Sequence, residues 1–236
     1  MDKSSHVIAV SNETMREIDR VTISEIGIPG LVLMEHAGKS VAERAWILAG
    51  SRQKKKFVIV CGKGSNAGDG FVAARWLNHL GGDVTVCILS SKDQYRGDSL
   101  VNFHILKALH ISVTNWPNQD SQEMFKESHL IIDAIFGTGF RGDLDGSFQN
   151  IINTMNQSGI PILAVDIPSG LCVKNNQICT PCIQAKETIT FGLAKNHLLE
   201  LPAVPYVGNL IVADIGFPSQ VVRQVIERDE KKSKHE

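Results

Sequence analysis

From residue 56 onward, short apolar runs rich in β-branched residues alternate with longer segments of helical length. The apolar runs are KFVIVC (56–61), DVTVCIL (83–89), HLIIDAIFG (129–137), PILAVDIPSG (161–170), TITFG (188–192) and NLIVADIG (209–216). The helical segments between them include GFVAARWLNHLG (70–81), SLVNFHILKAL (99–109) and SFQNIINTMNQSG (147–159). Such alternation is typical of βαβ units. We therefore predict a Rossmann-like α/β/α sandwich of three layers around a mostly parallel sheet.

Two extra helices are expected before this pattern begins. Apolar side chains recur at helical spacing between Met15 and Ile26, and a second helical pattern covers residues 31–48. Gly27 and Pro29 separate the two segments.

The chain is expected to form one domain. Its 236 residues, 43% of them hydrophobic, suffice for one sizeable core, and neither an internal repeat nor a flexible linker divides them. We predict a single domain over residues 1–228, followed by a charged, disordered tail over 229–236.

The charge balance argues against large anionic partners. The chain carries 24 Lys and Arg against 25 Asp and Glu, which favours neither nucleic acid nor an acidic membrane. No apolar run is long enough to cross a bilayer, and the N-terminus lacks the apolar core of a signal peptide. We expect a soluble cytoplasmic protein that acts on a small molecule.

The five cysteines favour a reducing compartment, because an odd, scattered set does not suit a disulfide framework. Cys179 and Cys182 form a lone CxxC in a polar loop. We interpret this pair as a coincidence, with a surface redox or metal pair as the alternative.

A glycine-rich segment follows the first strand of the pattern. Residues 62–70 read GKGSNAGDG, and a helix is expected to follow. Glycines permit positive φ angles and close backbone approach, and the N–H groups at a helix start can hold phosphate. Many strand-to-helix turns of this kind bind nothing, and Asp69 could simply cap the helix. The segment lacks the Gly-Lys-Ser/Thr ending of a nucleoside triphosphatase loop.

Two carboxylates stand at the ends of later strands. Asp133 ends the run HLII, and Asp166 ends PILAV. Ligands of open α/β sheets bind beyond the carboxyl ends of the strands, and a carboxylate in an apolar run is costly to bury without a partner. Each alone could be a turn-forming Asp. Together with the glycine segment they indicate one shared site.

Oxygen ligands near this site indicate an alkali or alkaline-earth cation. A carboxylate, the Ser169 hydroxyl and the Asn66 amide oxygen are hard donors. The eight histidines include no pair at zinc spacing, so we interpret them as core or solvated residues.

Several short motifs in a fixed order resemble the YjeF N-terminal domain family, whose enzymatic members are NAD(P)HX epimerases. The resemblance covers nearly the whole chain. It rests on Thr14-Met15-Arg16 with Asp19, GIPGLVLMEHAG (27–38), GKGSNAGDG (62–70), DAIFGTGF (133–140), VDIPSGL (165–171) and TFGLAK (190–195).

The resemblance implies site residues, a cation and partners. It implies a potassium ion held by Asn66, Asp133 and Ser169, and a catalytic Asp166. It also implies substrate binding by Ser65, Asn66, Ala67, Gly68, Asp69, Gly137, Thr138, Gly139, Phe140, Arg141, Gly142, Asp143 and Asp166. The implied partners are NADHX or NADPHX as substrate, a second copy of the chain in a homodimer, and a separate NAD(P)HX dehydratase in nicotinamide nucleotide repair. Ser65 and Ala67 replace the usual Asn and Gly of the loop, and Lys63 replaces a common Pro.

The implied reaction needs no redox step. Loss of the C6 hydroxyl gives an iminium ion that water can attack from either face, and one carboxyl such as Asp166 can serve as acid and then as base. Two rival functions stay open. One is a non-catalytic binding module on the same fold. The other is an NAD-linked dehydrogenase, for which Asp93 is only loosely placed as the ribose-binding acid. Lys195 is interpreted either as a phosphate or ribose contact or as a solvated strand-end lysine.

Overall fold

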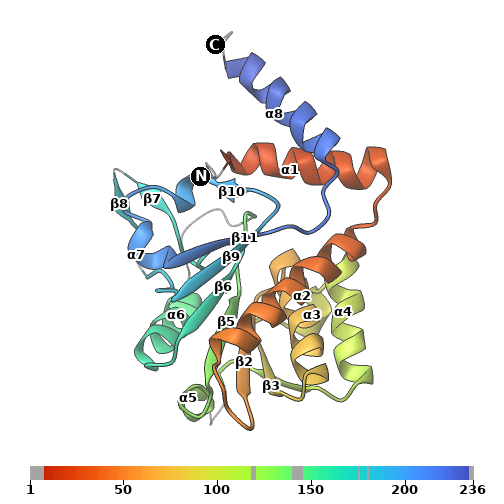
Figure 1. Cartoon of the computed structure of the whole chain (residues 1–236). Coiled ribbons are helices and arrows are strands. Elements are labelled where there is room, and N and C mark those ends of the chain that lie inside the picture. Colours follow the sequence, from red (N-terminus) through yellow and green to blue (C-terminus); the bar gives the residue numbers. More distant parts are fainter. Residues whose placement is uncertain (1–7, 118–120, 140–145, 175, 180, 234–236) are drawn as a thin grey trace.

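A seven-stranded, fully parallel sheet forms the centre of the molecule (Figure 1). The structure is a computed structural model and describes residues 8–117, 121–139, 146–174, 176–179 and 181–233. The strand order is β11-β9-β6-β5-β2-β3-β4. The strands are β2 (Lys56–Cys61), β3 (Asp83–Ile88), β4 (Ser112–Asn115), β5 (Leu130–Ala134), β6 (Ile162–Val165), β9 (Glu187–Phe191) and β11 (Asn209–Ala213). The predicted Rossmann-like sheet is confirmed.

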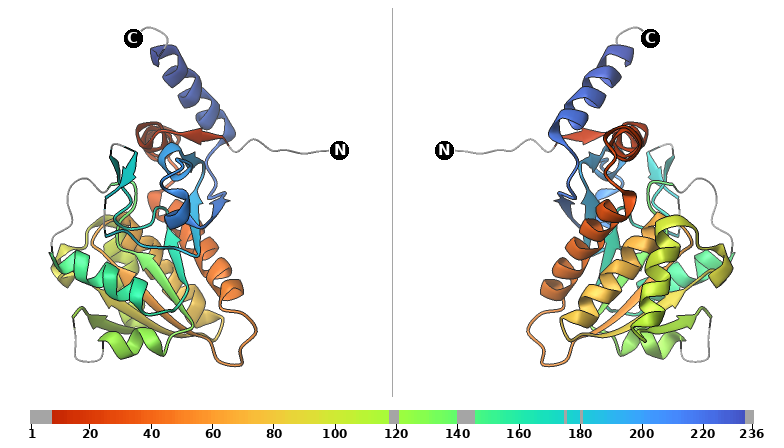
Figure 2. Two further views of the ribbon diagram at one scale, coloured as in Figure 1. Left: turned by 90° about the vertical axis from the view of Figure 1, so that its left-hand side faces the viewer. Right: turned by 90° about the vertical axis from the view of Figure 1, so that its right-hand side faces the viewer.

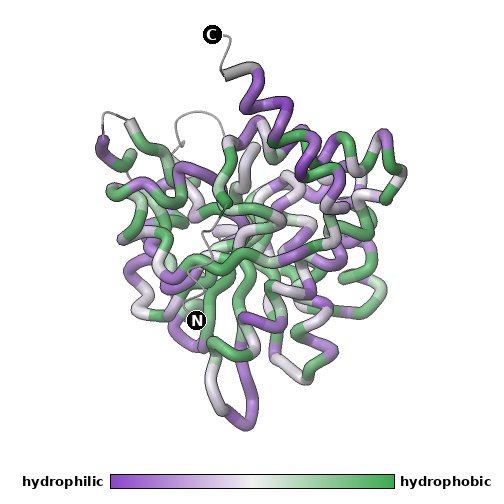
Figure 3. The backbone as a smooth tube through the Cα atoms, turned by 45° about the horizontal axis from the view of Figure 1, so that its top comes forward, coloured by the Kyte–Doolittle hydropathy of each residue, from purple (hydrophilic) through white to green (hydrophobic). Residues whose placement is uncertain are grey.

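Helices cover both faces of the sheet, which confirms the three layers (Figures 1 and 2). One face carries α2 (Gly30–Leu48), α3 (Ser65–His79) and α4 (Gly97–Ala108), whose apolar side chains share one core with the sheet. The other face carries α5 (Ser121–Lys126) and α6 (Gly146–Gln157), which pack in a second core. Figure 3 shows the hydrophobic segments gathered in the central strands. In the described part of the chain, no helix has the length and apolar character needed to cross a membrane.

The order of the strands reverses at β2. The chain runs outward from β2 through β3 to β4, then returns to the other side of β2 and continues through β5, β6, β9 and β11. At such a switch point the connections leave to opposite faces and open a crevice beyond the carboxyl ends of the two central strands. The fold therefore locates a ligand site beyond β2 and β5.

The N-terminal segment closes over this end of the sheet. The two-residue strand β1 (Ala9–Val10) pairs in parallel with β10 (Ala194–Lys195). It leads into α1 (Asn12–Val21), which continues as the π-helix η1 (Thr22–Ile26) and ends at Gly27 with φ of 86°. The two predicted N-terminal helices, α1 with η1 and α2, are thus present. Pairing of residues 9–10 with 194–195 brings α1 beside the site.

The prediction of a disordered tail over residues 229–236 is wrong for residues 229–233. The last helix, α8 (Ser219–Ser233), continues through residues 229–233, and Figure 1 shows it extending from the body beside α1. Val221 and Val225 pack against α1, and Asp229 Oδ2 accepts a 2.6 Å bond from Thr14 Oγ1. Charge alone did not predict this helix because its start is anchored by apolar packing.

The remaining elements are short. They are η2 (Lys92–Gln94) after β3, the hairpin of β7 (Val173–Lys174) and β8 (Gln177–Ile178), η3 (Asn196–Leu198) and α7 (Val204–Val207).

The glycine segment after β2 differs from the prediction. Helix α3 begins at Ser65, so most of the expected loop is helical, and its glycines are absent from the positive-φ positions. A Cβ on Gly68 would lie 2.5 Å from Met34 Sδ, and one on Gly70 would lie 2.8 Å from Ala134 Cβ. These glycines let α3 pack closely on α2 and on the sheet, so Ala67 meets no conformational penalty there.

Candidate active site at the carboxyl ends of the strands

A large cavity opens beyond β2 and β5, at the switch point of the sheet. Its volume is about 950 Å³, within the range of natural ligand pockets. Four groups of residues line it: Met15, Arg16 and Asp19 from α1; Lys63 to Asn66 and Asp69 after β2; Ile135 to Gly139 after β5; and Asp166 with Lys195.

Asp133 lies fully buried at the end of β5 and is tied to the loop after β6. Its Oδ2 accepts a 2.8 Å bond from Ser169 N, and its Oδ1 accepts bonds from Ser169 Oγ at 2.6 Å and from Ile135 N at 3.2 Å. Burial raises the pKa of Asp133 to about 6, although the bonds from Ser169 oppose this rise. The pair joins the β5 and β6 loops.

Asn66 brings an unpaired oxygen to the same region. Its Nδ2 donates a 3.0 Å bond to Phe136 O, while its buried Oδ1 has no hydrogen-bond partner among the residues that the structure describes. A Cβ on Gly137 would lie 3.4 Å from this Oδ1 and 3.0 Å from Asp166 Oδ2. Asn66, Gly137 and Asp166 therefore meet at one point of the cavity wall.

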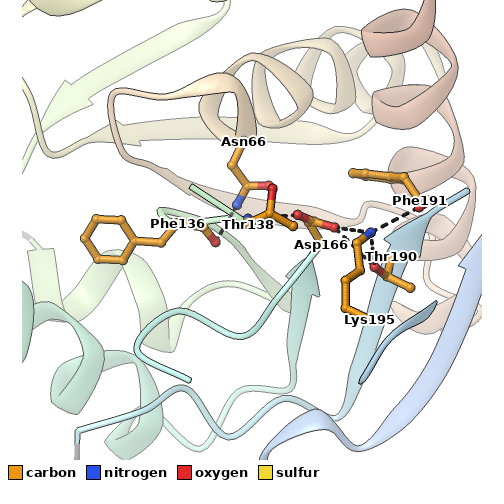
Figure 4. Close-up of polar contacts among 7 residues, drawn as sticks. All are labelled: Asn66, Phe136, Thr138, Asp166, Thr190, Phe191 and Lys195. Atoms are coloured by element: carbon orange, nitrogen blue, oxygen red, sulfur yellow. Dashed lines mark hydrogen bonds and ion pairs between the residues drawn. The ribbon is translucent and has the colours of Figure 1, made fainter. Parts of the chain in front are cut away.

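Asp166 follows β6 in a strained conformation. Its φ of 65° is uncommon for any residue other than glycine, and such strain concentrates at functional sites. Oδ1 accepts bonds from Lys195 Nζ at 2.8 Å and Thr190 Oγ1 at 3.1 Å, and Oδ2 accepts a 3.1 Å bond from Thr138 N (Figure 4). Two side chains and one backbone amide thus hold this carboxylate at the cavity wall.

The lysine beside Asp166 lies in the interior. Lys195 is only 1% exposed, so the reading of a solvated strand-end lysine is wrong. Sequence analysis missed its role because Lys195 lies on β10, which pairs with β1, a strand 185 positions earlier in the chain. The available signal was a Lys shortly after the strand TITFG and an Asp at the end of PILAV, whose strands lie side by side in the predicted sheet.

Two further carboxyls face the same cavity. Burial raises the pKa of Asp69 well above its usual value, and the negative charges of Asp166 and Asp19 raise it further. The pKa of Asp19 is raised first by burial and then by Asp166, while Lys195 opposes the rise. Protonated carboxyls near an anionic one can donate hydrogen bonds to a ligand. The alternative interpretation of Asp69 as a helix cap is wrong, because Asp69 lies inside α3 and Gly64 is the capping residue.

The predicted substrate-binding residues divide into three sets. Ser65, Asn66, Asp69, Gly137, Thr138, Gly139 and Asp166 line the cavity. Ala67 and Gly68 lie in the buried interior of α3 and do not line it. Phe140, Arg141, Gly142 and Asp143 lie outside the described residues.

Arg16 holds the segment after β5 from the opposite side. Its Nη2 donates to Thr138 O, while Thr138 N donates to Asp166. Helix α1 thus contributes to the position of the loop that binds Asp166.

Neither a zinc-type cluster nor a disulfide is found in the described part of the chain. Among those residues, no group of three or more His, Cys, Asp and Glu could hold a metal. All five cysteines are reduced, and burial raises the pKa of the Cys182 thiol above its usual value. Cys179 and Cys182 lie outside the cavity lining.

With this geometry in view, comparison with known proteins identifies the family. The family described as "YjeF-related protein N-terminus" matches residues 30–197, more than half of the chain. The chain belongs to this family. A bifunctional NAD(P)H-hydrate repair enzyme of Moorella thermoacetica is 38% identical over 90% of the chain, which spans 41% of that longer protein. An NAD(P)H-hydrate epimerase of Pirellula staleyi is 34% identical, with 89% of this chain and 93% of that protein covered.

A solved structure of this fold agrees with the comparison. The crystal structure of the yeast protein ynu0 has a TM-score of 0.79 with 26% identity, and the match covers 93% of each chain. The YjeF N-terminal fold therefore extends over nearly all of this molecule, including segments outside the matched residues 30–197.

Proposed function

We propose that this protein is an NAD(P)H-hydrate epimerase, which interconverts the R and S epimers at C6 of hydrated NADH and NADPH in nucleotide repair. The observation that carries the proposal is the strained, anchored Asp166 carboxylate on the wall of the cavity at the switch point of the sheet. Two relatives named NAD(P)H-hydrate epimerase match this chain over 93% and 99% of their own length, which supports the same activity.

The cavity can take a substrate of dinucleotide class. Its lining includes Gly64, Ser65 and Asn66 at the N-terminus of α3, a helix of 15 residues, and the positive end of a helix dipole favours a phosphate there. Lys63 and Ser65 line the cavity beside the N-terminus of α3, and Asp166 lines it from the loop after β6. We place the pyrophosphate near α3 and the nicotinamide ring beside Asp166.

The reaction needs one group that gives and takes a proton. When the C6–OH bond breaks, the ring nitrogen lone pair forms an iminium ion and the oxygen leaves as water after protonation. Water then attacks the planar carbon from either face, and a base removes its extra proton. Asp166 Oδ2 accepts one bond, from Thr138 N, in the described part of the chain and keeps a lone pair for this transfer. A positioned acid–base group contributes about 10²- to 10⁴-fold in rate.

We further propose that Asn66, Asp133 and Ser169 hold a potassium ion. The buried Asn66 Oδ1, which has no partner within the described ranges, and the all-oxygen donor set fit an alkali cation better than a transition metal. When bound, the ion adds positive charge and joins the loops after β2, β5 and β6. Proton transfer stays with the residues of the chain.

A direct assay tests the activity. A sample enriched in one NADHX epimer is incubated with the purified protein, and the two epimers are separated by chromatography over time. Exchange well above the spontaneous rate is expected. If the protein binds NADHX but leaves the exchange rate unchanged, the fold serves as a non-catalytic binding module, and the epimerase proposal fails.

The remaining expectations are also proposals. We expect a homodimer in the cytoplasm and a functional partnership with a separate NAD(P)HX dehydratase. Bifunctional relatives, of which this chain spans 38 to 41%, support the link between the two activities. Sedimentation analysis of the purified protein tests the dimer.

A further inference from the structure

The Lys195 ammonium uses all three of its donors inside the protein. It donates to Asp166 Oδ1 at 2.8 Å, Thr190 Oγ1 at 2.7 Å and Phe191 O at 3.0 Å (Figure 4). Because no N–H is left over, this lysine cannot also bind a phosphate or ribose without breaking one of these bonds. The role of Lys195 therefore depends on the groups to which it donates.

Several elements of the fold contribute to the contact between Lys195 and Asp166. Thr190 stands on β9 and donates to the same Asp166 oxygen that Lys195 binds. Gly192, with φ of 70°, turns the chain after β9 so that β10 returns Lys195 beneath the carboxylate. Pairing of β10 with β1 then fixes the lysine backbone.

These contacts divide the Asp166 carboxylate into two unlike oxygens. Oδ1 faces the interior, where it accepts bonds from Lys195 and Thr190. Oδ2 faces Gly137, where an added Cβ would approach within 3.0 Å, and it binds the Thr138 amide. Occupation of Oδ1 therefore determines which oxygen is presented to the cavity.

From this geometry we infer that Lys195 is a positioning residue for the epimerase reaction: its ammonium holds Asp166 so that Oδ2 is the oxygen that exchanges the proton with substrate. The inference rests on the proposed function. Because its three N–H groups donate within the protein, Lys195 acts on the reaction through Asp166. A residue with this task should affect kcat far more than KM, because substrate binding depends on other walls of the cavity.

The test compares two buried lysines. Lys195→Met removes the ammonium at the site. Lys55→Met is the matched control, because Lys55 is also buried and its Nζ donates to Trp46 O at 2.7 Å, at the opposite end of the sheet. Both variants are measured for melting temperature, kcat and KM with NADHX.

We expect Lys195→Met to lower kcat by about tenfold to a hundredfold, the range for loss of a hydrogen bond to a charged group, with KM changed by no more than about threefold. Lys55→Met should lower the melting temperature without changing kcat. In the Asp166→Asn background, Lys195→Met should cause no further loss of kcat. Additive losses, or an unchanged kcat in folded Lys195→Met, would overturn the inference.

The pH profile separates positioning from folding. Asp19, Asp69 and His197 also surround the Asp166 carboxylate, from α1, α3 and η3. A carboxylate that loses an adjacent ammonium binds a proton more readily, so the acidic limb of kcat should move to higher pH in Lys195→Met. An unmoved limb contradicts the inference.

Two further measurements cover the remaining cases. If Lys195→Met does not fold, Thr190→Val removes the hydroxyl shared by Lys195 and Asp166 and should lower kcat in the same way, by a smaller factor. A crystal structure of whichever variant folds should show the Asp166 carboxylate turned away from Thr138 N. This second result does not depend on activity, so it tests the positioning even if the parent protein shows no exchange. A carboxylate in its original place would refute the inference.

Discussion

Asp133 and Asp166 end neighbouring strands of one sheet, yet their surroundings differ in every respect that matters chemically. Asp133 is wholly enclosed and receives its bonds from backbone amides and the Ser169 hydroxyl. Asp166 lies at a cavity wall, in a strained backbone conformation, with an ammonium on one oxygen. The strand end fixes where a carboxylate lies, but partners from distant elements decide what it can do.

The difference in charge partners suits two separate tasks. Among the described residues, the hydrogen-bond partners of Asp133 include no cation, and burial raises its pKa to about 6. A bound cation would compensate its buried charge. Asp166 already has the Lys195 ammonium 2.8 Å from its Oδ1, while burial raises the pKa of the neighbouring Asp19 and Asp69 carboxyls. This difference supports the proposal that the first carboxylate binds an ion and the second transfers the proton.

Replacement of Asp166 by Asn should have the largest effect on activity. The amide keeps the size and an acceptor oxygen but cannot exchange a proton, so kcat should fall by about 10²- to 10⁴-fold. The protein should still fold, with some loss of stability because Lys195 loses its counter-charge. Epimer exchange per folded protein is the measurement, and exchange near the parent rate would move catalysis to another residue.

Replacement of Asp133 by Ala should act on stability first. It leaves the buried Ser169 N and Ile135 N without their acceptor, and each unsatisfied donor is costly, so the free energy of unfolding should fall by about 3 kcal/mol. Urea unfolding measures the change. Asp133→Asn retains one acceptor and is the control with a smaller loss. If Asp133→Ala is as stable as the parent protein, the joined loops contribute nothing to folding.

Potassium should stabilise the protein through the same loops. A ligand present at about a hundred times its Kd adds roughly 2.7 kcal/mol, which corresponds to a rise in melting temperature of about 5 to 10 °C for a chain of this size. Lithium at equal ionic strength controls for general screening. Equal melting temperatures in the two salts would exclude the cation site, and Asp133→Ala should erase any difference between them.

Much of this comparison could be predicted from the sequence. The alternation after residue 56 was sufficient for the parallel sheet, and position at strand ends was sufficient to bring Asp133 and Asp166 to one edge. Both follow from local pattern and from a general rule about parallel sheets.

The parts that sequence analysis missed all depend on contacts between distant segments. Gly68 and Gly70 lie inside α3, where they let the helix pack closely on α2 and β5, and no local pattern reveals these contacts. Lys195 is buried because β10 pairs with a two-residue strand near the N-terminus. Asp229 is held in a helix by Thr14. Composition described these residues correctly as polar but could not give their partners.

A third buried carboxylate provides a reference for the first two. Glu187 begins β9 at the opposite edge of the sheet, and its Oε1 accepts a 2.6 Å bond from Arg44 Nη2. The bond from Arg44 lowers the pKa of Glu187, while burial opposes this. Its pH dependence should therefore have the opposite sign to that of Asp133. The ionised pair stabilises the fold above the unfolded-state pKa, and this contribution is lost as the pH falls through the lower pKa of the folded state.

The expected effect of Glu187→Gln is the smallest of the four. The side chain of Arg44 is 30% exposed, so solvent screens the pair and the variant should lose about 1 kcal/mol of unfolding free energy at pH 7. The difference from the parent should shrink as the pH falls below about 4.5, because the unfolded parent then binds a proton at Glu187, and it should vanish once the pH has passed the lower pKa of the folded state. Urea unfolding from pH 7 to pH 3.5 measures it. Glu127→Gln is the matched control, since the exposed Glu127 carboxylate lies 3.0 Å from Lys56 Nζ and the loss of that pair should change stability much less. A difference between Glu187→Gln and its parent that grows on acidification would mean that this ion pair, like Asp133, is governed by burial rather than by its cation.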